Sequence, residues 1–314
     1  MKNGDAGRIV AIANQKGGVG KTTTAINLAV GLVSHSNGAK HGPPRILLVD
    51  LDPQGNATSG LTPPDKLGEV KASGKTVYEA IVGRIKLTEA VRKVRDNIFL
   101  LPSGPDLVGA EIELATVEGR ERRLKQILEP VRGEYGVVLI DTPPSLGLLT
   151  LNAMVAADSI IVPMQCEYYA LEGLTALLGT ITRIRKALNP ALEIDGLVLT
   201  MFDARNKLSH DVAREVNRHF PEKLFQSVIP RNVRLSESPS HGLSVIEYDA
   251  KSAGADAYRA LAAEVIARAE AARTGTDVSR ETSEAASKLE ASGRKSWSLR
   301  ALFSREGERG RKGA

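Results

Sequence analysis

The sequence predicts an α/β fold in which a mostly parallel, twisted sheet of about seven or eight strands carries helices on both faces. Three observations lead to this prediction. Short apolar runs typical of buried parallel strands alternate along the chain with longer runs typical of helices. A glycine-rich turn joins the first strand-like run to the first helix-like run. Several later apolar runs end on carboxylates or other polar residues, as strands do at the ligand-binding edge of an open α/β sheet.

Seven apolar runs have the length and composition of buried strands. They cover residues 9–13, 45–49, 97–101, 135–140, 159–164, 194–201 and 224–229. Helices are expected over residues 25–33, 107–114, 120–131, 171–188, 209–220 and 253–272. Residues 34–44 contain two glycines and two prolines and should form a surface loop, whereas the amphipathic pieces at 77–82 and 87–94 carry no recognisable chemistry.

The chain of 314 residues divides into one predicted domain, residues 1–272, and a basic tail, residues 273–314. An apolar fraction of 42% supports a real core in the domain. The tail is rich in Ser, Thr, Glu, Gly and Arg, so we expect it to be disordered. It holds ten of the 42 Lys and Arg residues and six of the 37 Asp and Glu residues, and therefore +4 of the net charge of +5. Any nucleic-acid surface on the domain must then be a local patch.

Cysteine content and apolar patterning bear on the compartment. The single cysteine, Cys166, cannot form a disulfide within the chain, which favours a reducing environment. No apolar run approaches about 20 residues, the length that crosses a bilayer, and the N-terminal residues lack the apolar segment of a signal peptide. The sequence thus predicts a cytoplasmic protein.

The stretch from Asn14 to Thr24 lies between the first strand-like run and the first helix-like run. Its glycines allow backbone N–H groups to turn toward a phosphate without interference from a Cβ atom. Lys21 can supply a positive charge to the β- and γ-phosphates of a nucleotide, the Thr22 hydroxyl suits Mg²⁺, and Thr23 can contact the α-phosphate. The alternative is an ordinary turn. The predicted phosphate-binding residues are Lys16, Gly17, Gly18, Val19, Gly20, Lys21, Thr22 and Thr23.

The regular P-loop pattern fails here, because Gln15 stands where the first glycine belongs and a second lysine, Lys16, lies inside the loop. The run Lys-Gly-Gly-Val-Gly-Lys-Thr, from Lys16 to Thr22, resembles the deviant Walker A motif of the ParA/MinD ATPase superfamily. The resemblance implies a P-loop NTPase fold. It also implies that Lys16 crosses a dimer interface to reach the partner's nucleotide, so that two chains enclose two ATP molecules.

Two further strand ends carry carboxylates. The run Asp50 to Thr58 resembles the second motif of the same superfamily, in which the second carboxylate, here Asp52, helps to position water for hydrolysis. Asp141 follows the apolar run at 135–140 and precedes Thr-Pro-Pro, which resembles the superfamily's Asp-x-Pro-Pro motif and places Asp141 at Mg²⁺. The alternative for each carboxylate is a structural cap at the end of a strand.

The segments 165–174 and 230–242 resemble the ParA/Soj branch more than they resemble MinD. By this resemblance, Pro230 and Asn232 fall where relatives contact the adenine ring. Arg205 and Arg234 match arginines that relatives use to hold DNA without sequence preference, a task suited to a permanent charge and a planar fork. The competing interpretation is that these arginines are surface ion-pair partners.

The resemblance as a whole implies a ParA/Soj-type, Mg²⁺-dependent ATP hydrolase with Lys16, Lys21 and Asp52 as its catalytic residues. Such a protein dimerises on ATP, binds DNA nonspecifically on the nucleoid and drives chromosome or plasmid partition with a ParB-type partner. Two alternatives stay open. The segment 294–305 mixes basic residues with Trp, Leu and Phe, so a MinD-like positioning factor could bind membrane through it, although its amphipathicity is weak. A ParA-like protein could also position another cargo.

Overall fold

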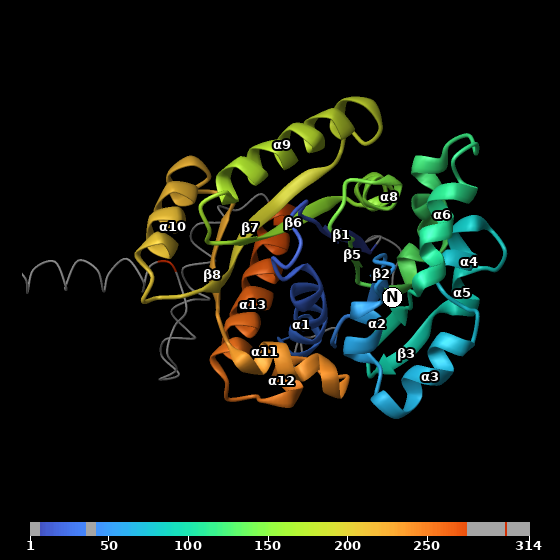
Figure 1. Ribbon diagram of the computed structural model, residues 1–314, viewed down its shortest axis with the longest axis horizontal. Coiled ribbons are helices and arrows are strands. Elements are labelled where there is room, and N and C mark those ends of the chain that lie inside the picture. The colour runs from blue at the N-terminus through green and yellow to red at the C-terminus, as the bar shows by residue number, and fades with distance from the viewer. Residues whose placement is uncertain (1–6, 36–41, 275–298, 300–314) are drawn as a thin grey trace, which may run out of the picture.

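The computed structural model describes residues 7–35, 42–274 and 299. Their strands form one eight-stranded sheet in the order β3-β4-β2-β5-β1-β6-β7-β8, in which β3 is antiparallel and the other pairings are parallel (Figure 1). The predicted fold class is therefore confirmed. The strands are β1 (Arg8–Ile12), β2 (Ile46–Asp50), β3 (Arg92–Arg95), β4 (Ile98–Leu101), β5 (Val137–Asp141), β6 (Ser159–Gln165), β7 (Glu193–Phe202) and β8 (Leu224–Pro230).

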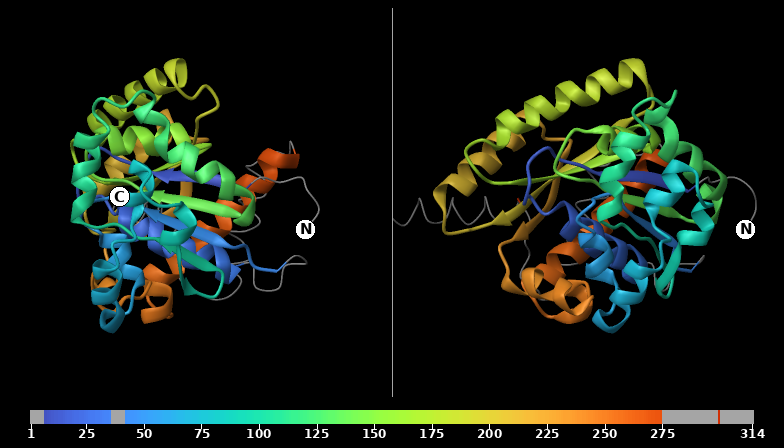
Figure 2. Two further views of the ribbon diagram at one scale, coloured as in Figure 1. Left: turned by 90° about the vertical axis from the view of Figure 1, so that its right-hand side faces the viewer. Right: turned by 45° about the vertical axis from the view of Figure 1, so that its right-hand side comes forward.

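Helices cover both faces of this sheet (Figure 2). Alternate strand residues point to opposite faces, so Ile9 and Ala11 of β1 join one apolar cluster and Val10 and Ile12 join the other. The helices are α1 (Lys21–His35), α2 (Asn56–Leu61), α3 (Pro64–Ala72), α4 (Val77–Val82), α5 (Leu87–Ala90), α6 (Val108–Glu113), α7 (Arg123–Leu128), α8 (Leu148–Ala156), α9 (Ala170–Ala187), α10 (Lys207–His219), α11 (Val233–Glu237), α12 (Val245–Tyr248) and α13 (Ala253–Thr274).

Three of the differences between the structure and the sequence-based expectations have a clear physical reason. Strand β3 overlaps the end of the predicted amphipathic piece 87–94, where pairing with β4 outweighs the local pattern. Helix α8 was not expected, because it is almost entirely buried and lacks the polar face that reveals a surface helix. The expected helix at 120–131 is divided into a short α7 flanked by 3₁₀ turns, the second of which contains a proline near its start.

Strand β8 forms one edge of the sheet, and α13 covers its open hydrogen-bonding groups. Glu264, which is 5% exposed, accepts hydrogen bonds from the backbone N–H groups of Gln226 at 2.9 Å and Ser227 at 3.0 Å. Arg268 donates to Glu264 at 3.0 Å and to the carbonyl of Leu224 at 2.8 Å. This ion pair therefore binds backbone groups of the edge strand that could otherwise pair with another strand.

Most of the predicted tail, residues 273–314, lies outside the described residues. Helix α13 continues to Thr274, two residues past the predicted end of the domain. Leu299 is described, is 2% exposed and belongs to the apolar cluster on the α8 and α9 face. Of the helices in the described parts of the chain, none is both long enough and apolar enough to cross a bilayer.

We expect Glu264→Ala to lower the free energy of unfolding by about 2 to 4 kcal/mol, because it leaves two backbone donors and the Arg268 guanidinium without their buried acceptor. Urea unfolding followed by circular dichroism measures this loss. Glu270→Ala, an exposed position on the same helix, is the matched control and should cost far less. Equal effects of the two substitutions would show that the Glu264 contacts do not hold the edge strand.

Candidate nucleotide-binding site

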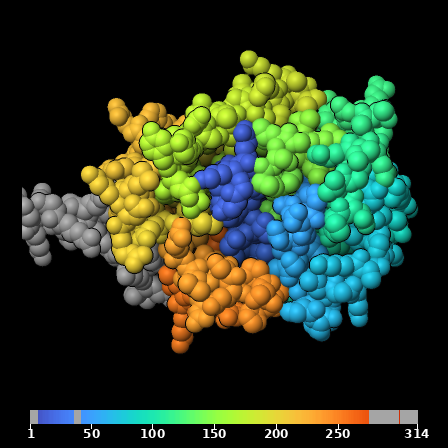
Figure 3. All heavy atoms as spheres, viewed as in Figure 1, coloured from blue at the N-terminus to red at the C-terminus, as the bar shows by residue number. Residues whose placement is uncertain are grey.

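The site residues gather at one edge of the sheet because the central strands run parallel. In the β2–β5 pairing Asp50 lies opposite Asp141, and in the β1–β5 pairing Ile12 lies opposite Asp141. The turns that follow β1, β2 and β5 therefore begin side by side. In Figure 3 the blue segment that follows β1 is open to solvent at the centre of this face.

The turn after β1 has the geometry of a phosphate cradle. Gly18 and Gly20 have φ angles of 71° and 86°, in the left-handed region that favours glycine. The Thr200 hydroxyl of β7 donates to the carbonyl of Val19 at 2.9 Å and fixes the middle of the turn. Lys21 opens α1, is 7% exposed, and donates to the carbonyl of Lys16 at 3.1 Å. Burial lowers the pKa of Lys21, while the charges of Asp141 and Asp52 oppose that shift.

Asp141 is fully buried, and neither of its carboxylate oxygens has a hydrogen-bond partner of normal geometry within the described residues. Burial and the neighbouring Asp50 raise its pKa well above the usual value, whereas the Thr22 hydroxyl and Lys21 partly offset that rise. A buried carboxylate of this kind fits a bound cation. No group of three or more His, Cys, Asp or Glu side chains in the described residues could hold a metal. A cation held by Asp141 and Thr22 would therefore complete its shell with phosphate and water, as Mg²⁺ does.

Asp50 and Asp52 have different surroundings. Asp50 is fully buried and accepts hydrogen bonds from the backbone N–H and the hydroxyl of Thr58, both at 2.7 Å, and from the N–H of Asp52 at 3.2 Å. Burial raises the pKa of Asp50 to about 6, against the opposing effect of these bonds. Asp52 is 7% exposed, and its side chain accepts from the N–H of Gln54 at 3.0 Å. Asp50 thus shapes the turn that carries Asp52.

Lys16 lies on the outer side of the turn, and its side chain is 45% exposed. Its ammonium group forms an ion pair with Glu167 of the same chain, in the turn that follows β6. Sequence reasoning missed Glu167, because 151 residues separate the two partners. Next to this pair the side chains of Tyr168 and Tyr169 are 75% and 67% exposed. The reach of Lys16 to a second chain stays a prediction.

The predicted adenine-binding residues lie after β8. Pro230 is the last residue of that strand, is buried and pairs with Phe202 of β7. Asn232 caps α11, because its side-chain oxygen accepts from the N–H of Arg234 at 2.8 Å. The loop therefore begins at the same edge of the sheet as the phosphate cradle. Contact of Pro230 and Asn232 with adenine remains a prediction.

Comparison with known proteins places this site in a family. A protein-family model described as an AAA domain matches residues 7–194. The chromosome partitioning protein ParA of Myxococcus xanthus is 49% identical over 83% of this chain and 89% of its own length. The sporulation initiation inhibitor protein Soj of Bacillus subtilis is 49% identical over 83% of this chain and 99% of its own length. The chain belongs to the ParA/Soj family of partitioning ATPases. The resemblance inferred from the sequence is confirmed.

Solved structures share the fold of this ParA/Soj-family chain under different names. Cobyrinic acid a,c-diamide synthase of Mycobacterium smegmatis, with bound ATP analogue and magnesium, is 37% identical with a TM-score of 0.70 and covers 85% of this chain and 97% of its own. MinD of Pyrococcus horikoshii, complexed with Mg-ADP, is 25% identical with a TM-score of 0.64 and covers 82% and 95%. A shared fold does not fix a function, so family membership is taken from the partitioning proteins.

Of the two arginines predicted to bind DNA, Arg205 lies in the turn after β7 and Arg234 lies in α11 of this ParA/Soj-family domain, and both form surface ion pairs. Arg205 pairs with Asp203 at 2.9 Å and lowers the pKa of the Asp203 carboxylate to about 2. Arg234 pairs with Glu237 at 2.8 Å and with Asp249 at 3.2 Å. The competing interpretation, that they are ion-pair partners, therefore describes this structure. Such exposed pairs contribute little energy, so the arginines can exchange carboxylate for phosphate.

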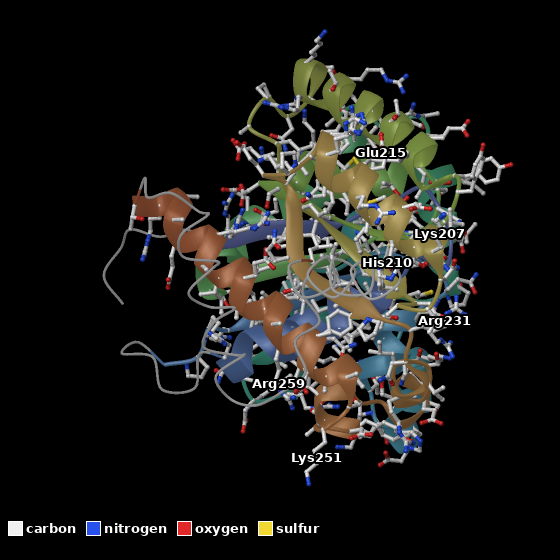
Figure 4. All side chains as sticks on the ribbon, turned by 90° about the vertical axis from the view of Figure 1, so that its left-hand side faces the viewer. Lys207, His210, Glu215, Arg231, Lys251 and Arg259 are labelled. Atoms are coloured by element: carbon white, nitrogen blue, oxygen red, sulfur yellow. The ribbon has the colours of Figure 1, made fainter. Side chains whose placement is uncertain are left out.

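Two further basic residues extend this patch, and sequence reasoning did not select them. Figure 4 shows Lys207, at the start of α10, and Arg231, after β8, on the same side of the domain. Both are exposed, and the charge of Arg231 helps to lower the pKa of Asp203. We call Arg205, Lys207, Arg231 and Arg234 the basic patch. The basic patch forms because the ends of β7 and β8 lie side by side, and a search along the sequence does not detect such proximity.

The buried carboxylates predict a pH dependence of the nucleotide-free protein. Folding raises the pKa of Asp50 from its usual 3.8 to about 6, so the folded state holds this proton more tightly than the unfolded state does. The resulting stabilisation is fully present below pH 3.8, the pKa in the unfolded state, and is lost as the pH rises through about 6, the pKa in the folded state. Asp50→Asn should therefore reduce the fall in unfolding free energy between pH 4 and 7 by about 1 to 3 kcal/mol in urea titrations. An unchanged slope would show that Asp50 does not titrate in this range.

Proposed function

We propose that this chain drives chromosome or plasmid partition by coupling ATP hydrolysis to dimerisation and DNA binding. As a ParA/Soj-family member, it is an ATP hydrolase that uses Mg²⁺. One observation carries the proposal. A phosphate cradle with two lysines lies beside a buried carboxylate, Asp141, which has no hydrogen-bond partner of normal geometry in the described residues.

The chain's own groups divide the work of hydrolysis. Backbone N–H groups of the turn hold the phosphates, and buried Lys21 places its charge at the β- and γ-phosphates. Thr22 and Asp141 would hold Mg²⁺, which supplies positive charge to the phosphate oxygens. Asp52 faces the same edge and would orient the attacking water. Because positioning and electrostatics dominate phosphoryl transfer, these groups need no covalent intermediate.

Lys16 would supply the switch. It is the exposed lysine of the motif, and its intrachain partner Glu167 is 44% exposed, so little energy holds the pair together. A triphosphate bound by a second chain offers Lys16 more negative charge than one carboxylate does. Pairing of the chains would thus depend on ATP, and hydrolysis would release them.

Dimerisation would turn two modest basic patches into one DNA-binding surface. Nonspecific affinity rises steeply with the number of phosphates neutralised, so doubling the patch has a large effect. The dimer would therefore bind the nucleoid in the cytoplasm while it holds ATP, and a ParB-type partner would stimulate its release. The MinD-like alternative places the tail in a membrane, yet Leu299 of that tail is buried against the domain. Positioning of another cargo stays open and is decided by the partner that the dimer captures.

We expect Asp52→Ala to bind ATP and to dimerise, but to release phosphate about 100-fold more slowly, because it loses only the water-orienting carboxylate. Adding Lys16→Ala should return this hydrolysis-deficient protein to monomers at saturating ATP and Mg²⁺, because the cross-subunit charge is removed. Light scattering coupled to size exclusion measures both states. If Asp52→Ala stays monomeric under these conditions, the proposed switch is wrong.

Arg234→Glu should lower the affinity of the ATP-bound dimer for DNA about tenfold at low salt, because each dimer loses two positive charges and gains two negative ones. Fluorescence anisotropy with duplexes of unrelated sequence gives the affinities. Lys66→Glu is the control, since it makes the same charge change at an exposed position on α3. Equal losses for the two variants would mean that net charge, and not the basic patch, governs binding.

A further inference from the structure

Ser103 is the residue that follows Pro102 at the end of β4, and it is 3% exposed. Its hydroxyl donates to the backbone carbonyl of Asp52 at 2.8 Å, and its N–H donates to the Thr58 hydroxyl at 2.9 Å. Asp52 begins the turn that follows β2, and Thr58 lies in α2, the helix that follows this turn. Ser103 therefore holds the chain on both sides of the turn, from the end of a strand on the other side of β2 from β5.

The contact between Ser103 and Thr58 is linked through further hydrogen bonds to Asp50 and Asp52. The Thr58 hydroxyl, which accepts from Ser103, donates in turn to Asp50 at 2.7 Å. Asp50 also accepts from the N–H of Asp52 at 3.2 Å. The residues form a closed network in which Ser103 binds the carbonyl of Asp52 and Asp50 binds its N–H. Thr58 is 0% exposed, so water does not compete for its bonds.

The support for Ser103 is itself rigid. The carbonyl of Pro102 accepts from the N–H of Val77 at 2.8 Å, which ties the segment to the start of α4. Gly55, with a φ angle of 62°, lies so close that a Cβ atom there would be 3.5 Å from the carbonyl oxygen of Ser103. The turn from Asp52 to Gly55 is thus packed directly onto this serine. Its position is set by β4 as well as by its own strand.

We propose that Ser103 is a positioning residue for hydrolysis, which acts by fixing the main chain of Asp52 so that its carboxylate meets the attacking water. The inference rests on the proposed role of Asp52. A displacement of about 1 Å in a catalytic group can cost a large factor in rate, and a single hydrogen bond to its backbone limits such displacement. The carbonyl of Asp52 also accepts from the N–H of Gly55 at 2.9 Å, so loss of the serine hydroxyl leaves the turn formed but less restrained.

The test uses full-length Ser103→Ala, with Ser103→Cys as a second variant of closely similar size, and measures phosphate release against ATP concentration. We expect kcat to fall about tenfold with KM for ATP and ATP-dependent dimerisation unchanged, because the phosphate cradle is untouched. In the Asp52→Ala background the same substitution should reduce the residual rate no further, since the group that it positions is gone. The buried Ser159 is the first residue of β6 and so lies at the edge of the sheet where the parallel strands begin, away from the site. It gives the control Ser159→Ala, whose kcat should match that of the natural protein.

The outcomes distinguish the proposed role of Asp52 from the proposed role of Ser103. Normal turnover by Asp52→Ala removes Asp52 from the site, and the positioning role of Ser103 goes with it. If Asp52→Ala is inactive while both Ser103 variants turn over normally, the inference about Ser103 alone is wrong. It is equally wrong if KM rises by the factor that kcat loses, or if Ser103→Ala slows the Asp52→Ala protein further, because either result indicates a general disturbance of the fold. If Ser103→Ala does not fold, the Ser103→Cys data decide by the same criteria.

Discussion

The structure depends on placing two carboxylates, Asp50 and Asp141, side by side at the buried ends of β2 and β5. Taking two like charges out of water is costly, and the raised pKa values of both groups express that cost. The two carboxylates are compensated differently. Asp50 receives hydrogen bonds from Thr58 and from the backbone, whereas Asp141 has no such partner within the described residues. Asp50 thus serves the local structure, whereas Asp141 fits the cation-binding role proposed above.

The same asymmetry separates the two lysines of the motif. Lys21 is buried beside Asp141 and Asp52; burial lowers its pKa, and the charges of the two carboxylates oppose that shift. Lys16 lies five residues earlier, is half-exposed and is held only by a surface ion pair with Glu167. A group that must leave one partner for another has to be weakly held and accessible. The buried lysine thus fits the role in hydrolysis proposed above, and the exposed one fits the proposed exchange between chains.

Much of this arrangement was predictable, because the informative residues are contiguous. The strand, the glycine-rich turn and Lys21 lie within one short stretch, and Asp52 and Asp141 follow apolar runs of unmistakable strand type. The residues that were missed act through contacts across the fold. Glu167 meets Lys16 over 151 positions, and Ser103 meets Asp52 over 51. Helix α8 was not predicted for a different reason, since nearly complete burial removes the periodic pattern that identifies a helix.

The nucleotide cradle and the basic patch share strand β7, which gives a physical route between them. The Thr200 hydroxyl on this strand holds the carbonyl of Val19, and the next residue, Met201, has a φ angle of 49° that a non-glycine side chain rarely adopts. Immediately beyond lies the loop with Arg205, and Phe202 pairs with Pro230 at the start of the loop with Arg231. A shift of the cradle would therefore act on a backbone that is already strained at the base of the basic patch. Met201 is thus the strained link between the residue that holds Val19 and the loop that carries Arg205.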